Sequence, residues 1–270
     1  ASTGKLSVTG YQDYNDAQKI LKEVNKYRKK NGRKALKMDR GLTNSAIMRG
    51  FETTIYIPET SPHRRPNGKL SKSINKKIIY ENCAQSAETT PKQIVKGWIN
   101  SSTHRKGLLL SNAKSVGVAA VTVVSRDGYE ANTWVLDFSS SKAKKVEKSK
   151  ARKQFTKNIV TKNSYLKKSY LKLDSRYGTI WETEKMQMKP TYQGKMMKEY
   201  GVYPTVINTS SFTSWKSSNP SVASVDSNGR ITGNKAGTVT ISAKLKTGTK
   251  ITISKKIKVV PTNQQIDPWE

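Results

Sequence analysis

The stretch of residues 78–104 constrains the fold most, because a strand pattern, a helix pattern and a histidine follow one another within it. Its first part, IIYENCA (residues 78–84), is an apolar run with β-branched and aromatic residues, which predicts a β-strand. Strand alternation places Glu81 and Cys83 on one face and Asn82 on the other. The stretch therefore predicts a carboxylate at a defined position of a sheet.

A helix is expected directly after this strand. Thr90 has the features of an N-cap, with Pro91 at the first helical position and Gln93 closing a capping box. Apolar residues then recur at helical spacing, namely Ile94, Val95, Trp98 and Ile99. The helix is therefore expected to bury that side.

The chain has only two histidines. His104 comes three residues after Ser101, so the two share a helix face if the last turn continues that far. His63 lies in SPHRRPNG, a Pro-, Gly- and Asn-rich segment that predicts a loop. If both imidazoles converge on Glu81, they form a partial metal site or an acid–base pair. The plainer alternative is that these groups are solvated or hydrogen-bonded without further function.

Before this stretch, the sequence predicts two helices. Residues 1–12 are polar with two glycines and are expected to be irregular. Apolar residues recur at helical spacing over residues 13–32, where a glycine ends the run. Asp39 is the expected cap of a second helix. Both helices are interpreted as core elements.

Around and after the stretch, a loop and a hairpin are expected. Residues 57–77 are a long loop of the kind that often carries function. Residues 104–112 are expected to form a turn with an apolar anchor. Residues 115–140 read as a β-hairpin with its turn at Asp127-Gly128. The apolar residues of this hairpin are interpreted as sheet core.

These motifs follow one another in an order that resembles a known family. His63 in a loop, YEN (80–82), TPKQIVKGWINSSTHRKGLL (90–109), SVGVAAV (115–121) and TWVLDF (133–138) are similar to a bacterial member of the CAP superfamily, also called the SCP-like extracellular domain. The resemblance covers residues 13–140 and implies an α-β-α sandwich with a large open cleft. In such proteins two histidines and usually two acidic residues line the cleft, and some members hold a divalent metal there.

Carried over by position, the resemblance assigns three residues to the cleft. His63 matches the first cleft histidine, Glu81 the Glu of the family's GEN motif, and His104 the histidine after the Trp-containing helix. The resemblance thus implies that His63, Glu81 and His104 act as three ligands of a divalent metal such as zinc, with an open position for water. Ser101 joins them as a ligand-binding residue of the cleft.

Three positions depart from the family pattern. Tyr80 stands where the family usually has Gly, and Cys83 replaces an aliphatic residue. Ser101 stands where eukaryotic relatives have a second Glu. A site with four protein ligands is therefore not expected, and the one other nearby carboxylate, Glu88, falls in a loop.

The sequence changes character after residue 140. Residues 141–176 carry thirteen Lys or Arg and two acidic residues, which predicts a solvated segment. We assign residues 141–169 as a lysine-rich linker and entry to a second domain. The alternative is a segment that anchors to anionic polymer by charge alone.

The second domain is expected to be all-β. Residues 211–245, with the motifs WKSSNPSVASVD and NGRITGNKAGTVTISA, and the closing strand KKIKVV resemble the bacterial Ig-like domain, group 2. The resemblance covers residues 170–261, and Trp215 is expected in the core of a sandwich. Such domains are wall-associated spacers or adhesion modules. The expected fold class is α+β, an α-β-α sandwich over residues 13–140 followed by a C-terminal all-β Ig-like sandwich.

Charge indicates the class of partner. The net charge is +31, from 50 Lys and Arg against 19 Asp and Glu, and such a chain is attracted to polyanions. Aromatic residues do not interleave with a basic strand, and no nucleic-acid motif is recognisable, so sequence-specific nucleic-acid binding is not expected. The expected partner is an anionic cell-wall polymer, a lipid or a glycan. The alternative is that the positive charge serves solubility and recognises no ligand.

The cysteine count and the hydropathy of the sequence indicate where the protein is located. A single Cys excludes an intramolecular disulfide and fits a secreted protein of a Gram-positive bacterium. No apolar run approaches the length of a membrane span. The chain opens ASTGKLSVTG without Met or a signal peptide, so a mature or trimmed form is expected. The family resemblances imply an extracellular or cell-wall-associated protein.

Three functions follow from these residues. The first is a non-enzymatic extracellular protein whose cleft binds a ligand, with the Ig-like domain as a spacer. The second is a hydrolase in which His63, Glu81 and His104 hold a metal that activates water. The third, a Cys83 nucleophile, needs a base within hydrogen-bond reach, and an inert core cysteine is the simpler interpretation. The missing second carboxylate and the lack of an oxyanion motif favour binding without turnover.

Overall fold

The computed structural model describes residues 2–55, 63–86 and 89–267. The chain divides into two compact units, each considered by itself. We call residues 9–123 and 130–157 the layered unit, and residues 1–8, 124–129 and 158–270 the sandwich unit. The expected domain boundaries at 13–140, 141–169 and 170–261 stay predictions. Within the described part of the chain, no helix is both long enough and apolar enough to span a bilayer.

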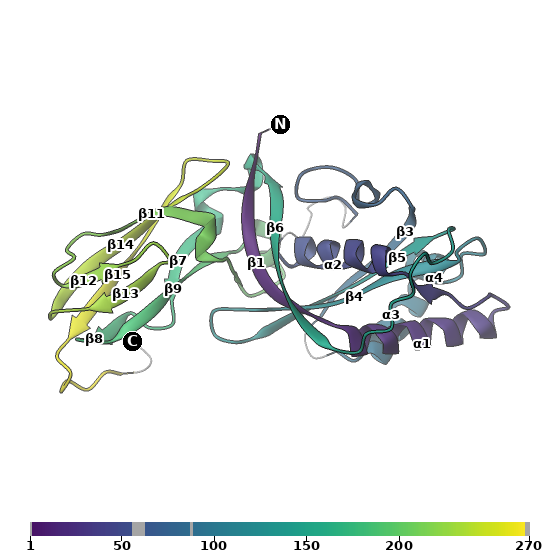
Figure 1. Cartoon of the computed structure of the whole chain (residues 1–270), viewed down its shortest axis with the longest axis horizontal. Helices are drawn as coiled ribbons and strands as arrows, with labels where there is room; N and C mark the ends of the chain where they lie inside the picture. The colour runs from purple at the N-terminus through teal and green to yellow at the C-terminus, as the bar shows by residue number, and fades with distance from the viewer. Residues whose placement is uncertain (1, 56–62, 87–88, 268–270) are drawn as a thin grey trace. The chain divides into compact units, whose positions relative to one another are not determined.

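The layered unit is built on one mixed sheet with the strand order β3-β5-β4-β1-β6, and β2 pairs with β4 at its side (Figure 1). Its strands and helices are β1 (Thr3–Asp13), α1 (Tyr14–Lys30), β2 (Lys37–Met38), α2 (Arg40–Ile55), β3 (Ile78–Ser86), α3 (Pro91–Asn100), α4 (Ser102–Leu108), β4 (Ser115–Val124), β5 (Glu130–Ser139) and β6 (Arg152–Lys162). Of these, β1, β4 and β6 run on into residues that are assigned to the sandwich unit. β3 lies at one edge of this sheet and pairs antiparallel with β5.

Helices α1, α3 and α4 cover one face of the sheet (Figure 1). The predicted capping box of α3 is present, because Thr90 and Gln93 exchange side-chain and backbone hydrogen bonds. The apolar stripes of these helices pack against alternate residues of β4 and β5, including Trp134, Leu136 and Phe138. The assignment of these three residues to core packing is therefore confirmed.

Helix α2 covers the opposite face. Asp39 caps it as predicted, with its carboxylate accepting from the Leu42 amide at 2.9 Å. The helix approaches β4 so closely that a side chain at Gly50 would press on Val121, and one at Gly117 would strike the Leu42 carbonyl. Helices on both faces of one sheet confirm the expected α-β-α arrangement.

Two local expectations were wrong. Residues 1–12 are not irregular, because residues 3–13 form β1. Leu6 and Val8 are buried in alternation there, and Gly10 lets the strand approach the Thr122 carbonyl. Residues 104–112 are not only a turn, because the chain re-enters a helix after Ser101 and forms α4 up to Leu108.

The sandwich unit carries the expected sheet-rich structure. One sheet has the order β10-β9-β13-β12, with β7 beside β9, and the other has the order β11-β14-β15-β8. Its elements are β7 (Leu171–Ser175), β8 (Thr179–Trp181), β9 (Lys185–Tyr192), α5 (Lys195–Glu199), β10 (Thr205–Val206), β11 (Phe212–Ser217), β12 (Ala223–Val225), β13 (Arg230–Gly233), β14 (Gly237–Leu245) and β15 (Thr252–Val260). Val239, Ile241 and Ala243 of β14 are buried, as their alternation predicted.

We expect Gly117→Ala to lower the free energy of unfolding of the layered unit by about 3 kcal/mol, because α2 must move away from β4 to admit a methyl group. Gly97→Ala is the matched control, since its added methyl meets nothing within 4 Å on α3. That substitution is expected to stabilise by about 0.5–1 kcal/mol through helix propensity. Urea unfolding followed by the helical circular-dichroism signal measures both. Equal effects of the two substitutions would contradict the tight contact of α2 with β4.

Candidate functional site

The site begins with Glu81 on β3, the edge strand. Glu81 is 6% exposed and faces the α2 side of the sheet together with Cys83, as strand alternation predicted. In the antiparallel register with β5 it lies opposite Asp137. A carboxylate this deeply buried requires a charged or hydrogen-bonding partner to stay ionised.

Arg49 of α2 provides that partner. Its Nε donates to one oxygen of Glu81 at 3.0 Å and its Nη2 donates to the other at 3.1 Å. Both side chains are almost fully buried, at 0% and 2% exposure. Two parallel N–H···O bonds between planar groups make this a bidentate ion pair, the strongest geometry available to a carboxylate.

The ion pair determines the charge of Glu81. Burial alone would raise the pKa of Glu81, but the hydrogen bond from His63 and the guanidinium of Arg49 lower it to about 2. Burial would likewise lower the pKa of Arg49, and Glu81 reverses that shift. Both groups are therefore charged at neutral pH.

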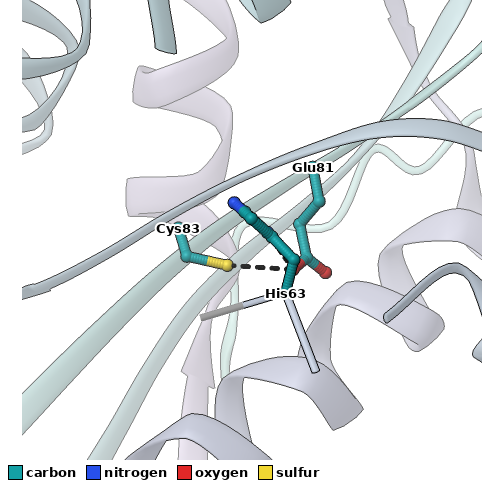
Figure 2. A group of neighbouring side chains, drawn as sticks. All are labelled: His63, Glu81 and Cys83. Carbon is teal, nitrogen blue, oxygen red and sulfur yellow. Dashed lines mark hydrogen bonds and ion pairs between the residues drawn. The ribbon is translucent and has the colours of Figure 1, made fainter. Parts of the chain in front are cut away.

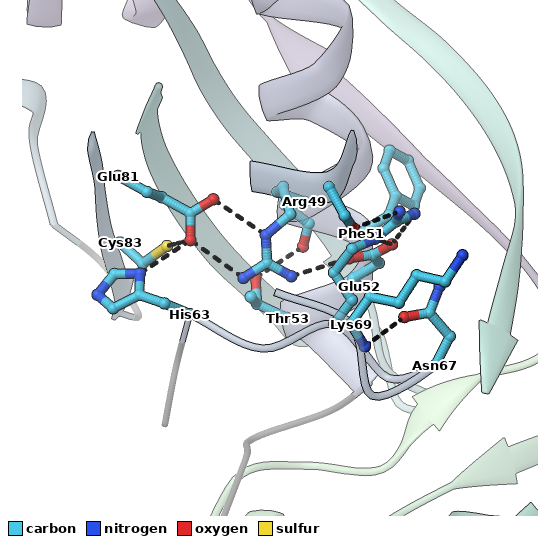
Figure 3. Close-up of polar contacts among 12 residues, drawn as sticks. Arg49, Phe51, Glu52, Thr53, His63, Asn67, Lys69, Glu81 and Cys83 are labelled. Carbon is cyan, nitrogen blue, oxygen red and sulfur yellow. Dashed lines mark hydrogen bonds and ion pairs between the residues drawn. The ribbon is translucent and has the colours of Figure 1, made fainter. Parts of the chain in front are cut away.

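The charged chain continues beyond this pair (Figure 3). Arg49 also donates from Nη1 to Glu52 at 2.8 Å, and Glu52 accepts from Arg65 at 2.7 Å. At the other end, His63 contacts Glu81 through Nδ1 at 3.0 Å. The segment that carries His63 and Arg65 is thus held to the buried core at two points.

His63 is the most exposed member of this series of charged contacts, with a side chain 41% exposed against 16% for Arg65. Because Glu81 is ionised and can only accept, the Nδ1–H of His63 is the donor in their hydrogen bond. In the tautomer with its proton on Nδ1, the acceptor nitrogen of the ring is Nε2. Glu81 therefore orients His63 and sets its tautomer, the role that a buried carboxylate plays toward a functional histidine.

Cys83 joins the same cluster but is not activated (Figure 2). Its thiol donates to Glu81 at 3.2 Å. Burial raises the pKa of the Cys83 thiol well above its usual range, and the Glu81 charge raises it further. A thiol that is neutral at physiological pH is a weak nucleophile, so the inert interpretation of Cys83 is the better supported one.

His104 and Ser101 form a second polar pair. The Nδ1 of His104 lies 2.8 Å from the Ser101 hydroxyl. Their helix is attached to β3 by Asn82, which donates to the His104 carbonyl at 2.9 Å, and by Tyr80, which donates to the Thr103 carbonyl at 2.7 Å. Burial lowers the pKa of His104, and the nearby His63 lowers it further, so His104 is a neutral imidazole at physiological pH.

Asp137 completes the site from β5. It is 0% exposed, and neither of its oxygens has a donor partner among the described side chains and backbone groups. Burial raises the pKa of Asp137 well above its usual range, and the neighbouring Glu81 charge adds to that rise. The opposite directions of these two pKa shifts favour a protonated Asp137 beside an ionised Glu81.

We tested these residues against the divalent metal that the family resemblance implies. His63, Glu81 and Cys83 each offer a ligand atom within 4.8 Å of one another, and no group containing His104 meets that distance among the described residues. Both oxygens of Glu81 already accept from Arg49, whose positive charge opposes a second cation. A ligating thiol must also lose its proton, and burial and the Glu81 charge, which raise the pKa of Cys83, oppose that loss. The donor set does not fit a divalent metal.

Sequence reasoning missed Arg49, Glu52 and Asp137. A signal for Arg49 was present, because it lies three residues after Ala46 and seven after Leu42, on the apolar stripe of α2. A charged residue at core spacing beside a predicted buried carboxylate indicates an internal ion pair. No comparable sequence signal identified the protonated state of Asp137, because that state depends on the cross-strand register.

Two segments of the chain match protein-family models. Residues 21–138 match the CAP model, described as the cysteine-rich secretory protein family. Residues 193–258 match the model of the bacterial Ig-like domain (group 2). These ranges fall on the two regions whose motifs resembled the same families.

One curated relative is the uncharacterized protein YkwD of Bacillus subtilis (strain 168), 33% identical over 119 residues. The match covers 43% of this chain and 44% of YkwD, so the chain spans less than half of that relative. An extracellular SCP-domain protein of Bacillus anthracis is a similar solved structure, with 21% identity, a TM-score of 0.36, and coverage of 47% of this chain and 41% of that one. An outer surface protein of Borrelia burgdorferi has 17% identity, a TM-score of 0.37, and coverage of 50% and 99%.

We expect Asp137→Asn to remove a pH dependence of stability. The folded state raises the pKa of Asp137 above the unfolded value, about 3.9, so folding retains a proton that the unfolded chain loses. Above that pH the free energy of unfolding falls, by up to about 1.4 kcal/mol per pH unit, until Asp137 ionises in the folded state.

Urea unfolding at pH 5 and pH 8 measures how the free energy of unfolding changes with pH. Both pH values lie above the unfolded pKa of about 3.9, and they lie on either side of neutrality. Asp137→Asn keeps the size of the side chain and removes its titration, so it is expected to narrow the difference in the free energy of unfolding between the two pH values. Glu130→Gln, at the exposed end of β5, is the control. It should leave the difference in the free energy of unfolding between pH 5 and pH 8 unchanged. A difference that persists in Asp137→Asn would contradict the assignment of the proton to Asp137.

Proposed function

Because residues 21–138 form a CAP domain and residues 193–258 form a bacterial Ig-like domain (group 2), we propose that the protein is secreted or cell-wall-associated and binds a ligand through its CAP domain without turning it over. In this proposal the Ig-like domain is a spacer or adhesion module. The bidentate Arg49–Glu81 pair, which fixes His63, is the observation that carries the proposal.

The chemistry of these residues favours a polar ligand. His63 and His104 are partly exposed imidazoles, and Ser101 adds a hydroxyl next to His104. Glu81 is too deeply buried and too fully bonded to reach a ligand, so it acts as a positioning residue for His63. Imidazoles and a hydroxyl suit the hydroxyl and amide groups of a wall glycan or peptide.

A metal-dependent hydrolase, the alternative function for these residues, gains no support from the donor set. Arg49 occupies the carboxylate on which a metal would depend, and the reaction needs a metal to activate water. We therefore derive no hydrolytic step from this site.

The proposal predicts retention on wall material through the two histidines. The test is co-sedimentation of the intact protein with peptidoglycan sacculi stripped of anionic polymers, in about 0.5 M salt, where screening acts over about 4 Å. His63→Ala combined with His104→Ala is expected to weaken binding about tenfold, because two hydrogen-bonding groups are lost.

Lys96→Ala combined with Lys106→Ala is the charge control on the adjacent helices α3 and α4. Both lysines are exposed, and their removal leaves the two imidazoles in place. Retention of the histidine variant at the level of the unsubstituted protein would reject the proposed site.

A further inference from the structure

The outer face of the sheet β11-β14-β15-β8 has an unusual composition. Its inward residues are apolar and buried, as in Val239, Ile241 and Ile257. The strands β8, β11, β14 and β15 contain no Asp or Glu at all. The outward residues of β11, β14 and β15 at paired positions are exposed or half-buried, and they are Thr213, Lys216, Thr238, Thr240, Ser242, Lys244, Thr252, Ser254, Lys256 and Lys258. We call these ten residues the lysine face.

The strand register arranges the lysine face in four rows, each with one lysine and its hydroxyl-bearing neighbours. The rows are Lys244 with Thr213 and Thr252, Lys216 with Ser242 and Ser254, Lys256 with Thr240, and Lys258 with Thr238 and with Thr179 of β8. Successive rows are two residues apart along β14, a spacing of about 7 Å. The face is therefore a regular array of positive charges.

These four lysines lack internal counter-charges. No carboxylate of the described residues lies within the 4.0 Å of an ion pair from any of them, whereas Lys255, which is mostly buried on the other side of β15, pairs with Asp174 at 3.3 Å. Like charges held close on one sheet face repel one another. An anionic partner relieves that repulsion and releases counterions on binding.

We propose that the lysine face binds a linear polymer of three-carbon polyols joined through their terminal hydroxyls by phosphodiesters. Six single bonds separate successive phosphorus atoms in such a polymer. Two extended residues contribute the same number of backbone bonds, about 7 Å in all, so consecutive phosphates match consecutive rows. In each row the lysine supplies charge and the Ser or Thr hydroxyls supply donors to phosphate oxygens.

Spacing alone does not distinguish this polymer from a nucleic-acid strand, whose phosphates are also six bonds apart. Side chains do distinguish them. Proteins that hold single strands stack bases on aromatic rings, and none of the ten residues of the lysine face is aromatic. An exposed aromatic side chain of the same sheet, Trp181 at the end of β8, donates its indole N–H to the Gln264 carbonyl. The face thus provides charge and hydroxyls without a platform for bases. This inference concerns the Ig-like domain and does not depend on the proposed CAP site.

The test measures binding of the intact protein to end-labelled poly(glycerol phosphate) by fluorescence polarisation at about 50 and 200 mM salt, where ionic contacts differ strongly. The variant Lys216→Gln, Lys244→Gln, Lys256→Gln, Lys258→Gln is expected to bind at least tenfold more weakly. Its salt slope should fall by about 3, the value for four lost phosphate contacts on a flexible chain.

The matched control changes four exposed lysines elsewhere in the sandwich unit: Lys168→Gln, Lys185→Gln, Lys198→Gln and Lys235→Gln. This control variant removes the same charge. Its affinity for the polymer should stay within about twofold of that of the unsubstituted protein, because salt screens surface charges that are remote from the bound polyanion. Thermal unfolding checks that both variants stay folded. His63→Ala with His104→Ala should leave polymer binding unchanged.

Three results would overturn the inference. If both quadruple variants lose affinity equally, net charge alone attracts the polymer. If the lysine-face variant binds as the unsubstituted protein does, the polymer binds elsewhere. If a mixed-sequence single-stranded DNA binds as tightly and with the same dependence on the four lysines, the partner class is nucleic acid.

Discussion

The buried ion pair between Arg49 and Glu81 is the interaction on which the candidate site depends. The pair joins helix α2 to the edge strand β3 through two hydrogen bonds of 3.0 and 3.1 Å. Removing either partner would leave an uncompensated charge in the core, which costs about 3–5 kcal/mol. The same pair keeps Glu81 ionised, and an ionised Glu81 is what orients His63.

This arrangement separates the residues that hold the site from those that can meet a ligand. Glu81 and Arg49 are buried and bonded to each other, so their charges are not available to solvent, and Asp137 beside them is fully buried. His63 and His104 are the partly exposed groups. A carboxylate that is already bonded to an internal guanidinium is a poor metal ligand. These residues therefore favour recognition of a ligand by hydrogen bonds over metal chemistry.

Local patterns predicted much of the fold and less of the site. Strand alternation at Glu81 and Cys83 and the capping box at Thr90 depend on a few neighbouring residues, and both predictions were confirmed. The strand at residues 3–13 was missed because its stability comes from pairing with distant strands and not from its own composition. The partnership of Arg49 with Glu81 joins elements 32 residues apart, so periodicity along α2 marks Arg49 as a core position without identifying its partner.

The most direct test is nitrogen-detected NMR of the imidazole rings, recorded at alkaline pH where histidine is neutral. With two histidines in the chain, the signals are assigned by comparison with His104→Ala. We expect His63 to carry its proton on Nδ1, where the Glu81 carboxylate accepts it. We also expect added zinc to leave the ring signals of His63 unshifted. A His63 protonated on Nε2, or ring signals that move stoichiometrically with zinc, would contradict these expectations.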